Sequence, residues 1–409
     1  MEFSKIKISD IGRIVTGKTP KTSISENYGG NIPFLTPSDN LSNKYVPKTT
    51  KTITELGLSE VKNCLLPANS ICVSCIGSDL GKVVLTTTPL VTNQQFNSII
   101  PSNDFDSDYI YYLMTIIGKQ INFLSKTSTA VPIINKSTFS NLDVFVPSLN
   151  DQIHIAKILS SLDDKIELNR QINDNLEQQA QALFKSWFVD FEPFKDGEFI
   201  ESELGMIPKG WKVGSLNEFC SNIERGNIPK YVDKSNSPIL NQKVNKGLYL
   251  DTQYYKFNDD NAIVQDSKLA QKGDVLVNSL GQGTLGRIHL YKETKNNVIV
   301  DQFITILRTT SFVKSIYLYL LLNTDIYQNV IESNITGSTG MWVLTINNIR
   351  KIKIVQPHDC EFEKIESYFS SIYNSISANN AEIERLSTLR DTLLPRLMSG
   401  ELKINEINC

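Results

Sequence analysis

The sequence predicts an α+β protein with an internal pseudo-two-fold repeat: two globules of mixed α/β structure, each followed by a long helix, and the two helices pairing as an antiparallel coiled coil. Three observations carry this prediction. Residues 151–188 place apolar side chains on a seven-residue repeat. The same rows return 210 residues later in the chain. The globules that precede the two helical segments share turn and glycine positions.

The first helical segment has the a/d spacing of a coiled coil. A helix of this length measures about 55 Å, and its outer faces are too polar for an ordinary core helix. It therefore needs a partner helix. The predicted seam residues of this first helix are Ile155, Leu159, Leu162, Ile166, Asn169, Leu176 and Leu183.

The partner helix lies in the same chain. Asn169 aligns with Asn379, and a polar residue at a seam position fixes register at some loss of stability. Two unrelated amphipathic helices in separate cores are the alternative, which ten aligned seam positions argue against. Arg390 stands where the seam expects an apolar residue, which predicts a locally wet or partner-contacting seam. The second set of seam residues is Ile365, Phe369, Ile372, Ile376, Asn379, Ile383, Leu386 and Leu393.

Each globule alternates short strand-like runs with turn residues, and a helix is predicted over residues 108–125 of the first. The domain prediction is a globule over 1–150, a long helix over 151–190, a linker over 191–210, a second globule over 211–359, a second long helix over 360–399 and a tail over 400–409.

The two globules correspond locally, with an offset of about 205 to 209 residues. Leu80-Gly81-Lys82 matches Leu285-Gly286-Arg287, and Gln95-Phe96 matches Gln302-Phe303. Turn positions recur while the residues between them differ freely. This is the pattern expected of one fold that serves two different ligands.

Composition and charge argue against a membrane protein and are compatible with binding to nucleic acid. Apolar residues make up 40% of the chain, and no run approaches the roughly 18 apolar residues of a membrane span. The first residues contain no apolar export signal, so a cytoplasmic protein without membrane contact is expected. Residues 151–203 carry a net charge of −7 and residues 361–403 one of −2, which leaves +6 on the remainder of a chain whose net charge is −3. Basic globules on acidic helices suit contact with phosphate by the globules.

Three motifs and the two-copy layout resemble one known family. The motifs are Leu204-Gly205-Met206-Ile207-Pro208-Lys209-Gly210-Trp211 before the second globule, Val146-Pro147-Ser148-Leu149-Asn150-Asp151-Gln152-Ile153 after the first, and Leu393-Leu394-Pro395-Arg396-Leu397-Met398-Ser399-Gly400 near the end. In this order they resemble the specificity subunit of type I restriction-modification systems. The first copy lacks the Ile-Pro-x-Gly-Trp motif, and Glu361-Phe362 replaces Asp151-Gln152 after the second globule.

The resemblance implies a DNA-recognition subunit without catalysis of its own. Each globule would be a target-recognition domain that reads one half of a split double-stranded DNA site, and the paired helices would hold the half-sites apart. The family implies two methylation subunits and a restriction/translocase subunit as partners. S-adenosylmethionine, ATP and Mg are expected on those partners, and no cofactor or metal is expected in this chain.

Base readout requires Arg, Lys, Asn or Gln on rigid loops, with Lys, Arg, Ser and Thr on phosphate. The candidates at matching loop positions are Lys18, Ser78, Lys82, Gln94 and Gln95 in the first globule, and Asn227, Lys230, Gln282, Arg287 and Gln302 in the second. Each has a solvated surface residue as its alternative, and the recurring Gln95 and Gln302 have a buried structural role as theirs.

Enzyme interpretations are weaker. Residues 281–286 match GxGxxG, but the strand-like residues 287–291 that follow favour a hairpin loop over a dinucleotide fold. Asp274 with Glu293 and Lys295 has the residue types of a nuclease site but no counterpart in the first copy. Cys72 and Cys75 form a CxxC in a strand-like run, which favours small buried side chains over a zinc half-site. A protein-only coiled-coil scaffold with two ligand-binding globules is the main alternative function, and a stand-alone nuclease is the third.

Overall fold

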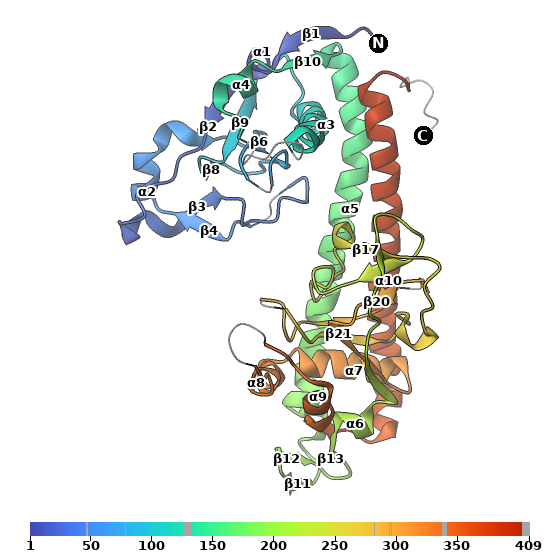
Figure 1. Ribbon diagram of the computed structural model, residues 1–409. Helices are drawn as coiled ribbons and strands as arrows, with labels where there is room; N and C mark the ends of the chain where they lie inside the picture. Colours follow the sequence, from blue (N-terminus) through green and yellow to red (C-terminus); the bar gives the residue numbers. More distant parts are fainter. Residues whose placement is uncertain are drawn as a thin grey trace. The chain divides into compact units, whose positions relative to one another are not determined.

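The computed structural model describes residues 1–45, 48–77, 79–125, 133–281, 283–293, 295, 297–337 and 342–402. The chain divides into two compact units, one formed by Met1–Leu168 with Ile383–Cys409 and the other by Asn169–Glu382. Two long helices, α5 (Leu149–Phe184) and α10 (Asp359–Met398), contribute a segment to each unit. Each unit therefore holds one globule and two helical segments (Figure 1).

The first globule contains two four-stranded sheets and a short strand pair. One sheet has the order β2 (Gly12–Thr16), β9 (Phe96–Pro101), β6 (Ile71–Ser74), β7 (Val83–Leu85), with all neighbours antiparallel. The other has the order β4 (Lys51–Ile53), β3 (Tyr28–Leu35), β8 (Leu90–Thr92), β5 (Leu65–Leu66), and β3 runs parallel to β8. Strand β1 (Ser4–Lys7) pairs with β10 (Asp143–Val146) just before α5 begins. The helices are α1 (Ile8–Ile11), α2 (Glu55–Glu60), α3 (Ser107–Ser125) and α4 (Lys136–Ser140).

The second globule repeats this plan. Its first sheet has the order β14 (Asn222–Arg225), β21 (Ile304–Arg308), β18 (Val275–Asn278), β19 (Ile288–Leu290). Its second has the order β15 (Tyr231–Val232), β17 (Lys256–Asn258), β16 (Pro238–Leu240), β20 (Ile299–Val300), with β16 parallel to β20. Strand β13 (Lys212–Ser215) pairs with β22 (Lys353–Gln356) just before α10. The helices are α6 (Leu216–Phe219), α7 (Phe312–Leu322), α8 (Asp325–Ser333) and α9 (Ile346–Lys351).

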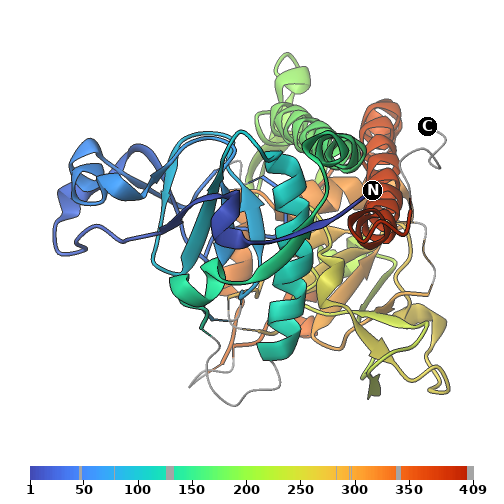
Figure 2. The ribbon, with the colours of Figure 1, turned by 90° about the horizontal axis from the view of Figure 1, so that it is seen from above.

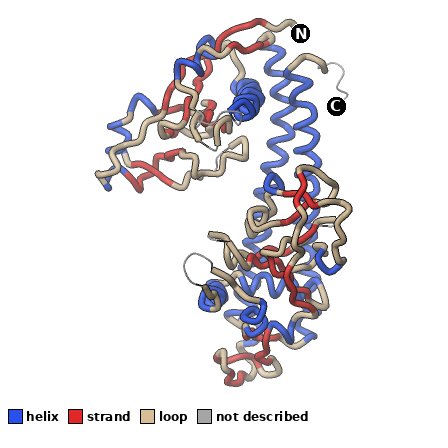
Figure 3. Tube along the Cα trace, viewed as in Figure 1, coloured by secondary structure: helices blue, strands red, loops and turns tan. Residues whose placement is uncertain are grey.

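The strand orders establish the internal repeat in three dimensions. The order β2-β9-β6-β7 corresponds to β14-β21-β18-β19, and the parallel pair β3–β8 corresponds to β16–β20. The tube in Figure 3 shows how short these strands are and how much of each globule is loop. Long loops between short strands can change in sequence while the sheets persist. Scaffold positions therefore recur between the copies, and loop residues do not.

Between the globules, the predicted linker contains regular structure. After α5 the chain continues through a π-helical turn over Lys185–Val189, and β11 (Phe199–Ser202) and β12 (Gly205–Pro208) form an antiparallel hairpin. Trp211 follows the hairpin and packs edge-on against Phe191 and Phe194, with ring centroids 5.6 and 5.0 Å apart. Aromatic packing of this kind stabilises one conformation of residues 191–211, although their Gly and Pro content is typical of a loop.

The core of each globule includes side chains from both long helices. In the first unit, Ile155 and Leu159 of α5 and Leu394 and Leu397 of α10 share one buried cluster with Tyr109 of α3. In the second unit, a corresponding cluster contains Ala180 and Phe184 of α5 and Phe362 and Phe369 of α10. Every predicted seam residue is buried or half-buried. Residues of the heptad rows thus bury apolar area in the cores of the globules, a role that the heptad spacing alone did not predict.

Polar contacts between the helical segments run in opposite chain directions. In the second unit, Asn169 Nδ2 donates to Glu382 Oε2 at 2.9 Å, Asn173 Nδ2 to Asn380 Oδ1 at 2.9 Å and Tyr373 OH to Glu177 Oε1 at 3.2 Å. The α10 number falls as the α5 number rises, so the segments are antiparallel there. Figure 2 views the first unit with its segments of α5 and α10 end-on.

Candidate nucleic-acid interface

Three loops of the first globule meet where β2 ends, β6 ends and β9 begins. The backbone N–H of Lys18 donates to Thr92 O at 2.9 Å, which joins the loop after β2 to the end of β8, where the loop before β9 begins. Thr19 Oγ1 donates to Gln94 Oε1 at 2.7 Å across the same junction. The N–H of Cys75 donates to Gln95 O at 2.7 Å, which brings the loop after β6 to this edge. The structure thus gathers these predicted positions at one edge of the sheet.

The predicted side chains in these loops differ in exposure. Lys18 and Gln94 are exposed, and the side-chain amide of Gln94 accepts from Thr19 through its Oε1. Gln95 is half-buried, and its Oε1 accepts from Asn93 Nδ2 at 2.8 Å, which holds the loop rather than pointing outward. Lys82 is half-buried at the far end of its loop. Ser78 lies outside the described residues.

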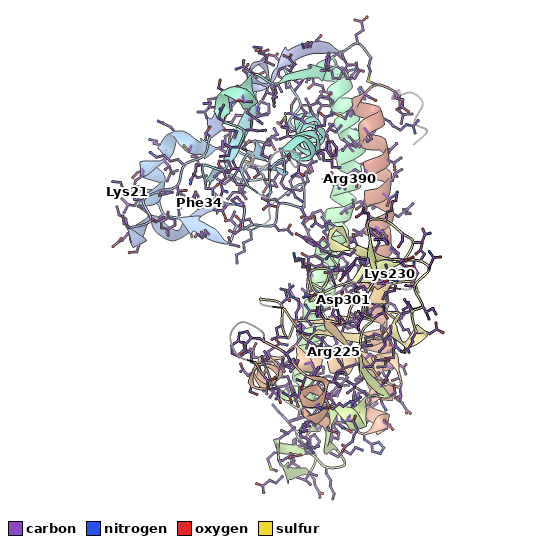
Figure 4. All side chains as sticks on the ribbon, in the orientation of Figure 1. Lys21, Phe34, Arg225, Lys230, Asp301 and Arg390 are labelled. Carbon is purple, nitrogen blue, oxygen red and sulfur yellow. The ribbon has the colours of Figure 1, made fainter. Side chains whose placement is uncertain are left out.

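The second globule forms the same three-loop junction. The N–H of Asn227 donates to Val300 O at 2.7 Å, and the N–H of Ser279 donates to Phe303 O at 2.9 Å. Gln302 is half-buried beside Asp301, whose carboxylate accepts from Tyr231 OH at 2.9 Å and from the N–H of Phe303 at 2.9 Å. Burial raises the pKa of Asp301. Figure 4 shows Asp301 and Lys230 on the second globule.

The predicted cations of the second globule already have partners. Lys230 is exposed, but its Nζ lies 2.7 Å from Asp259 Oδ2, and this hydrogen bond lowers the pKa of Asp259 to about 2. Arg287 is half-buried, and its Nη1 donates to Asn245 O at 2.8 Å. Asn227 is half-buried, with its Nδ2 donating to Ile228 O at 3.0 Å. Gln282 lies outside the described residues.

A cavity of about 410 Å³ adjoins the loop between β18 and β19. One of its lining residues is Lys246, a half-buried lysine that was not among the residues predicted from the sequence. Lys246 and Arg287 both line it, together with Gly283 and Thr284 of the GxGxxG segment and Gln181 of α5. The described residues around this cavity include no carboxylate side chain. Lys246 also stacks over the Tyr254 ring at 4.5 Å. Its one sequence signal was the Lys-Gly pair in the loop after β16, which has no counterpart in the first copy.

The GxGxxG segment is a hairpin loop. It connects β18 to β19, which pair antiparallel, so a strand follows it where a dinucleotide fold needs a helix. Gly281 and Gly286 have φ values of 108° and 80°, which only glycine adopts without strain. The hairpin interpretation of this segment is confirmed.

Asp274 has the environment of a structural carboxylate. Its Oδ1 accepts from Arg308 Nε at 2.8 Å, and its Oδ2 from Arg308 Nη2 at 3.1 Å and from the N–H of Gln271 at 2.9 Å. Burial raises the pKa of Asp274. These bonds occupy both of its oxygens.

The cysteines of the CxxC motif are buried in the sheet. Cys72 lies in β6 and Cys75 follows it, and burial raises the thiol pKa of both, that of Cys72 to about 12. Such thiols behave as small apolar side chains. Among the described residues, no group of three or more His, Cys, Asp or Glu side chains has the arrangement of a metal site. The described helices include none that is both long and apolar enough to cross a membrane.

Comparison with known proteins shows which domain family and which proteins this chain resembles. Residues 1–178 and 208–388 each match the type I restriction modification DNA specificity domain. The chain is 31% identical to the type I restriction enzyme MjaIX specificity subunit of Methanocaldococcus jannaschii, over 98% of this chain and 94% of that protein. It is 34% identical to the HindI specificity subunit of Haemophilus influenzae over 43% of this chain and 39% of that protein.

A solved structure shares the fold. The S subunit of a type I restriction-modification system from M. genitalium matches 97% of this chain and 96% of its own, with a TM-score of 0.53 at 17% identity. The repeated strand order described above agrees with two copies of one domain in the chain. This chain therefore belongs to the family of type I restriction-modification specificity subunits, with one target-recognition domain in each half.

Proposed function

We propose that this chain reads a split double-stranded DNA site, with one half-site bound by each recognition domain. The observation that carries the proposal is the three-loop junction that occurs in both globules on matching strands. Because the loop residues differ between the copies, the two junctions would read different base sequences. Lys18 and Gln94 in the first globule, and Lys246 and Arg287 in the second, are the side chains we assign to DNA.

The two long helices are proposed to pair as an antiparallel coiled coil that separates the half-sites. Contacts between α5 and α10 within the second unit run antiparallel and include the register-fixing Asn169. A helix as long as α5 measures about 54 Å. Half-sites on one face of a duplex are about 34 Å apart, so a rod of this length is sufficient. The heptad count would then set the spacer of the recognition sequence.

Catalysis is assigned to partner subunits. The chain would dock two methylation subunits, which bring S-adenosylmethionine, and a restriction/translocase subunit that uses ATP and Mg. The acidic outer faces of α5 and α10 offer a docking surface distinct from the basic globules. The whole complex would act in the cytoplasm, where the DNA lies.

Methylome sequencing tests this proposal. One host would express this chain with the methylation subunit encoded beside it, and a second host would lack only this chain. The expected result is a new methylated motif of two short blocks with a fixed gap, present only in the first host. Assembly of the complex without any new motif would contradict it and favour a protein-only coiled-coil scaffold.

A footprint on a duplex carrying that motif provides an independent check. Two protected patches with an uncontacted gap are expected from two domains on one face of DNA. A scaffold that binds proteins through both globules would protect neither patch.

A further inference from the structure

Arg390, the polar residue at an apolar position of the predicted seam, forms an ion pair with Asp163. Arg390 of α10 lies beside α5 in Figure 4, and its Nη1 is 2.6 Å from Asp163 Oδ1. The Asp163 side chain is 5% exposed, so this carboxylate has lost most of its water. Burial lowers the pKa of Arg390, but the charges and hydrogen bonds of Asp163 and the adjacent Asp391 together leave this pKa above the usual value. The Asp163 end of this ion pair is therefore largely desolvated, whereas the Arg390 side chain is 26% exposed.

The first globule contacts the same carboxylate. Tyr112 of α3 donates from its hydroxyl to Asp163 Oδ2 at 2.6 Å, and this contact is buried. The two oxygens of Asp163 thus hold different parts of the first unit: Oδ1 holds α10 and Oδ2 holds the recognition domain. Residues of α3 and α10 thus both donate to the carboxyl group of Asp163 in α5.

A second cation fixes Tyr112 from the globule side. The side chain of Lys44 is 3% exposed, and its Nζ lies 2.5 Å from Asp108 Oδ1, 3.5 Å from Tyr112 OH and 5.1 Å from the Tyr112 ring centroid. Burial lowers the pKa of Lys44, yet its bond to Asp108 leaves this pKa above the usual value. Lys44, Asp108, Tyr112, Asp163 and Arg390 thus form one network, and Arg390 also pairs with Asp391 at 2.9 Å on its exposed side.

The second unit is built differently at the matching place. The repeat aligns Asp163 with Tyr373 and Arg390 with Ala180, so the ion pair has no counterpart there. Tyr373 donates instead to Glu177 of α5, with Gln181 also donating to Glu177 at 3.3 Å. Tyr319 of α7, the counterpart of Tyr112, packs perpendicular to Tyr373 with ring centroids 6.1 Å apart. Each domain is thus joined to its helical segments by a different set of polar groups.

We propose that Asp163 is a positioning residue for DNA recognition, which fixes the orientation of the first recognition domain on its helical segments. This inference rests on the proposed reading of a split site. A desolvated carboxylate tolerates few arrangements of its donors, because any displacement leaves a buried charge unpaired. The domain therefore occupies one orientation, and its half-site must lie at one distance and one rotation from the other half-site. One base pair of spacer changes these by about 3.4 Å and about 35°.

The test compares two tyrosines of the same helix. Tyr112→Phe removes the hydroxyl that ties the domain to Asp163 and leaves the ring and the Asp163–Arg390 pair in place. Tyr109→Phe is the matched control, because Tyr109 is also buried in α3 but its hydroxyl has no hydrogen-bond partner among the described residues. Each variant would be assembled with its methylation subunits, and methylation rates measured on duplexes with the native spacer and with one base pair added or removed.

The expected result is a change in spacer discrimination. The ratio of the native-spacer rate to the altered-spacer rate should fall at least about fivefold in Tyr112→Phe and stay at the wild-type value in Tyr109→Phe. The preference for the bases of each half-site should persist in both. A general loss of folded protein lowers all rates together and leaves the ratio unchanged, so the ratio reports positioning rather than stability.

A second variant and the wild type separate the possible failures. Arg390→Met keeps Tyr112 but removes the α10 side of the network, and the same loss of spacer discrimination is expected. Wild-type ratios in both Tyr112→Phe and Arg390→Met would overturn the positioning role while the split-site function stands. Absence of split-motif methylation by the wild-type complex would instead overturn the proposed function itself.

Discussion

Tyr109 and Tyr112 lie one turn apart on α3, and both are buried, yet their hydroxyl groups have opposite energetic roles. Tyr112 donates to Asp163 Oδ2, in the carboxyl group that also pairs with Arg390, at 2.6 Å. The hydroxyl of Tyr109 is buried with no hydrogen-bond partner in the described structure, and burial raises its pKa. A hydrogen bond to a charged group stabilises by about 1.5–3 kcal/mol, whereas an unsatisfied buried hydroxyl costs about 1–3 kcal/mol.

We therefore predict stability changes of opposite sign for two conservative substitutions. Tyr109→Phe should raise the free energy of unfolding by about 1 kcal/mol, because it removes an unsatisfied polar atom. Tyr112→Phe should lower it by about 2 kcal/mol, because it removes a donor from a buried carboxylate. Equilibrium urea unfolding of the full chain measures both. Destabilisation of equal size in the two variants would show that the hydroxyl partners do not matter.

The buried His289 makes the second unit sensitive to pH. Its ring is fully buried, its Nδ1 lies 2.6 Å from Gly247 O, and burial together with the nearby Lys292 charge lowers its pKa. The native histidine therefore takes up its proton at a lower pH than the unfolded one, whose pKa is about 6.5, even though Glu293 lies 4.0 Å from its Nε2 and opposes this shift. Because the unfolded state binds more protons, stability falls as pH falls through this value.

We predict that the free energy of unfolding decreases as the pH falls below about 6.5, and that one substitution at His289 removes this dependence. Between pH 8 and pH 7 the His289 contribution should be constant, and below about 6.5 it should fall by up to about 1.4 kcal/mol per pH unit. His289→Gln, which keeps a donor for Gly247 O, should abolish this part of the slope. Unfolding midpoints of both proteins across pH 5.5–8 provide the measurement, and parallel curves would contradict the assignment.

Residue-level partners were the least predictable part of the molecule. Lys230 is a plausible phosphate contact from sequence, but Asp259 neutralises it because β15 and β17 pair, and nothing in the sequence gives that pairing. Lys246 was missed because its role depends on a cavity shared with Arg287. Arg390 was recognised as an anomaly, but its partner Asp163 could be found only once the register of the helical segments was known.

Secondary structure was more accessible because it depends on local pattern. The helix predicted over 108–125 is α3 (Ser107–Ser125), and the hairpin predicted at the GxGxxG segment is the β18–β19 connection. The long helices begin and end within a few residues of the predicted bounds, apart from the π-helical turn after Phe184. A heptad pattern does not show which residues pack against it, however. Part of both heptad rows is buried in the cores of the two globules.

Helix pairing is testable by cross-linking inside the second unit. Asn173 and Asn380 contact each other, so cysteines at these positions should be joined by a short thiol-reactive linker in a Cys360→Ser background. Cysteines at Asn173 and Glu366 should not react, because Glu366 lies about 21 Å further along α10. Efficient linking of the second pair, or none of the first, would contradict the antiparallel register.

At the scale of the whole molecule, the repeat supplies two target-recognition domains with the same strand order. Each three-loop junction is held by its own backbone hydrogen bonds, so substitutions in one loop set need not disturb the other. Sites on separate domains with no shared partners usually contribute independently to binding. The two halves of the recognition sequence should therefore respond separately to mutation.

Two alanine substitutions test this independence. Gln94→Ala should relax base preference in one block of the methylated motif and Arg287→Ala in the other, each by about tenfold, since a good side-chain contact to a base contributes about 1–3 kcal/mol of discrimination. Lys5→Ala, an exposed lysine paired with Asp143 on the β1–β10 strand pair, is the control and should change neither block. Methylation rates on duplexes with single-base changes in each half give the answer, and loss of both blocks from one substitution would refute separate reading.

The unlike polar networks of the two units also limit how this gene can evolve. An exchange that replaced the α10 segment with a copy of the α5 segment would place aspartate at position 373 and alanine at position 390. Glu177 would then meet a second buried carboxylate in place of the Tyr373 hydroxyl, and Asp163 would lose its hydrogen bond from Arg390 of α10. Exchange of loops alone would leave both polar networks in place, whereas a chain in which both helices carry the same sequence should be less stable.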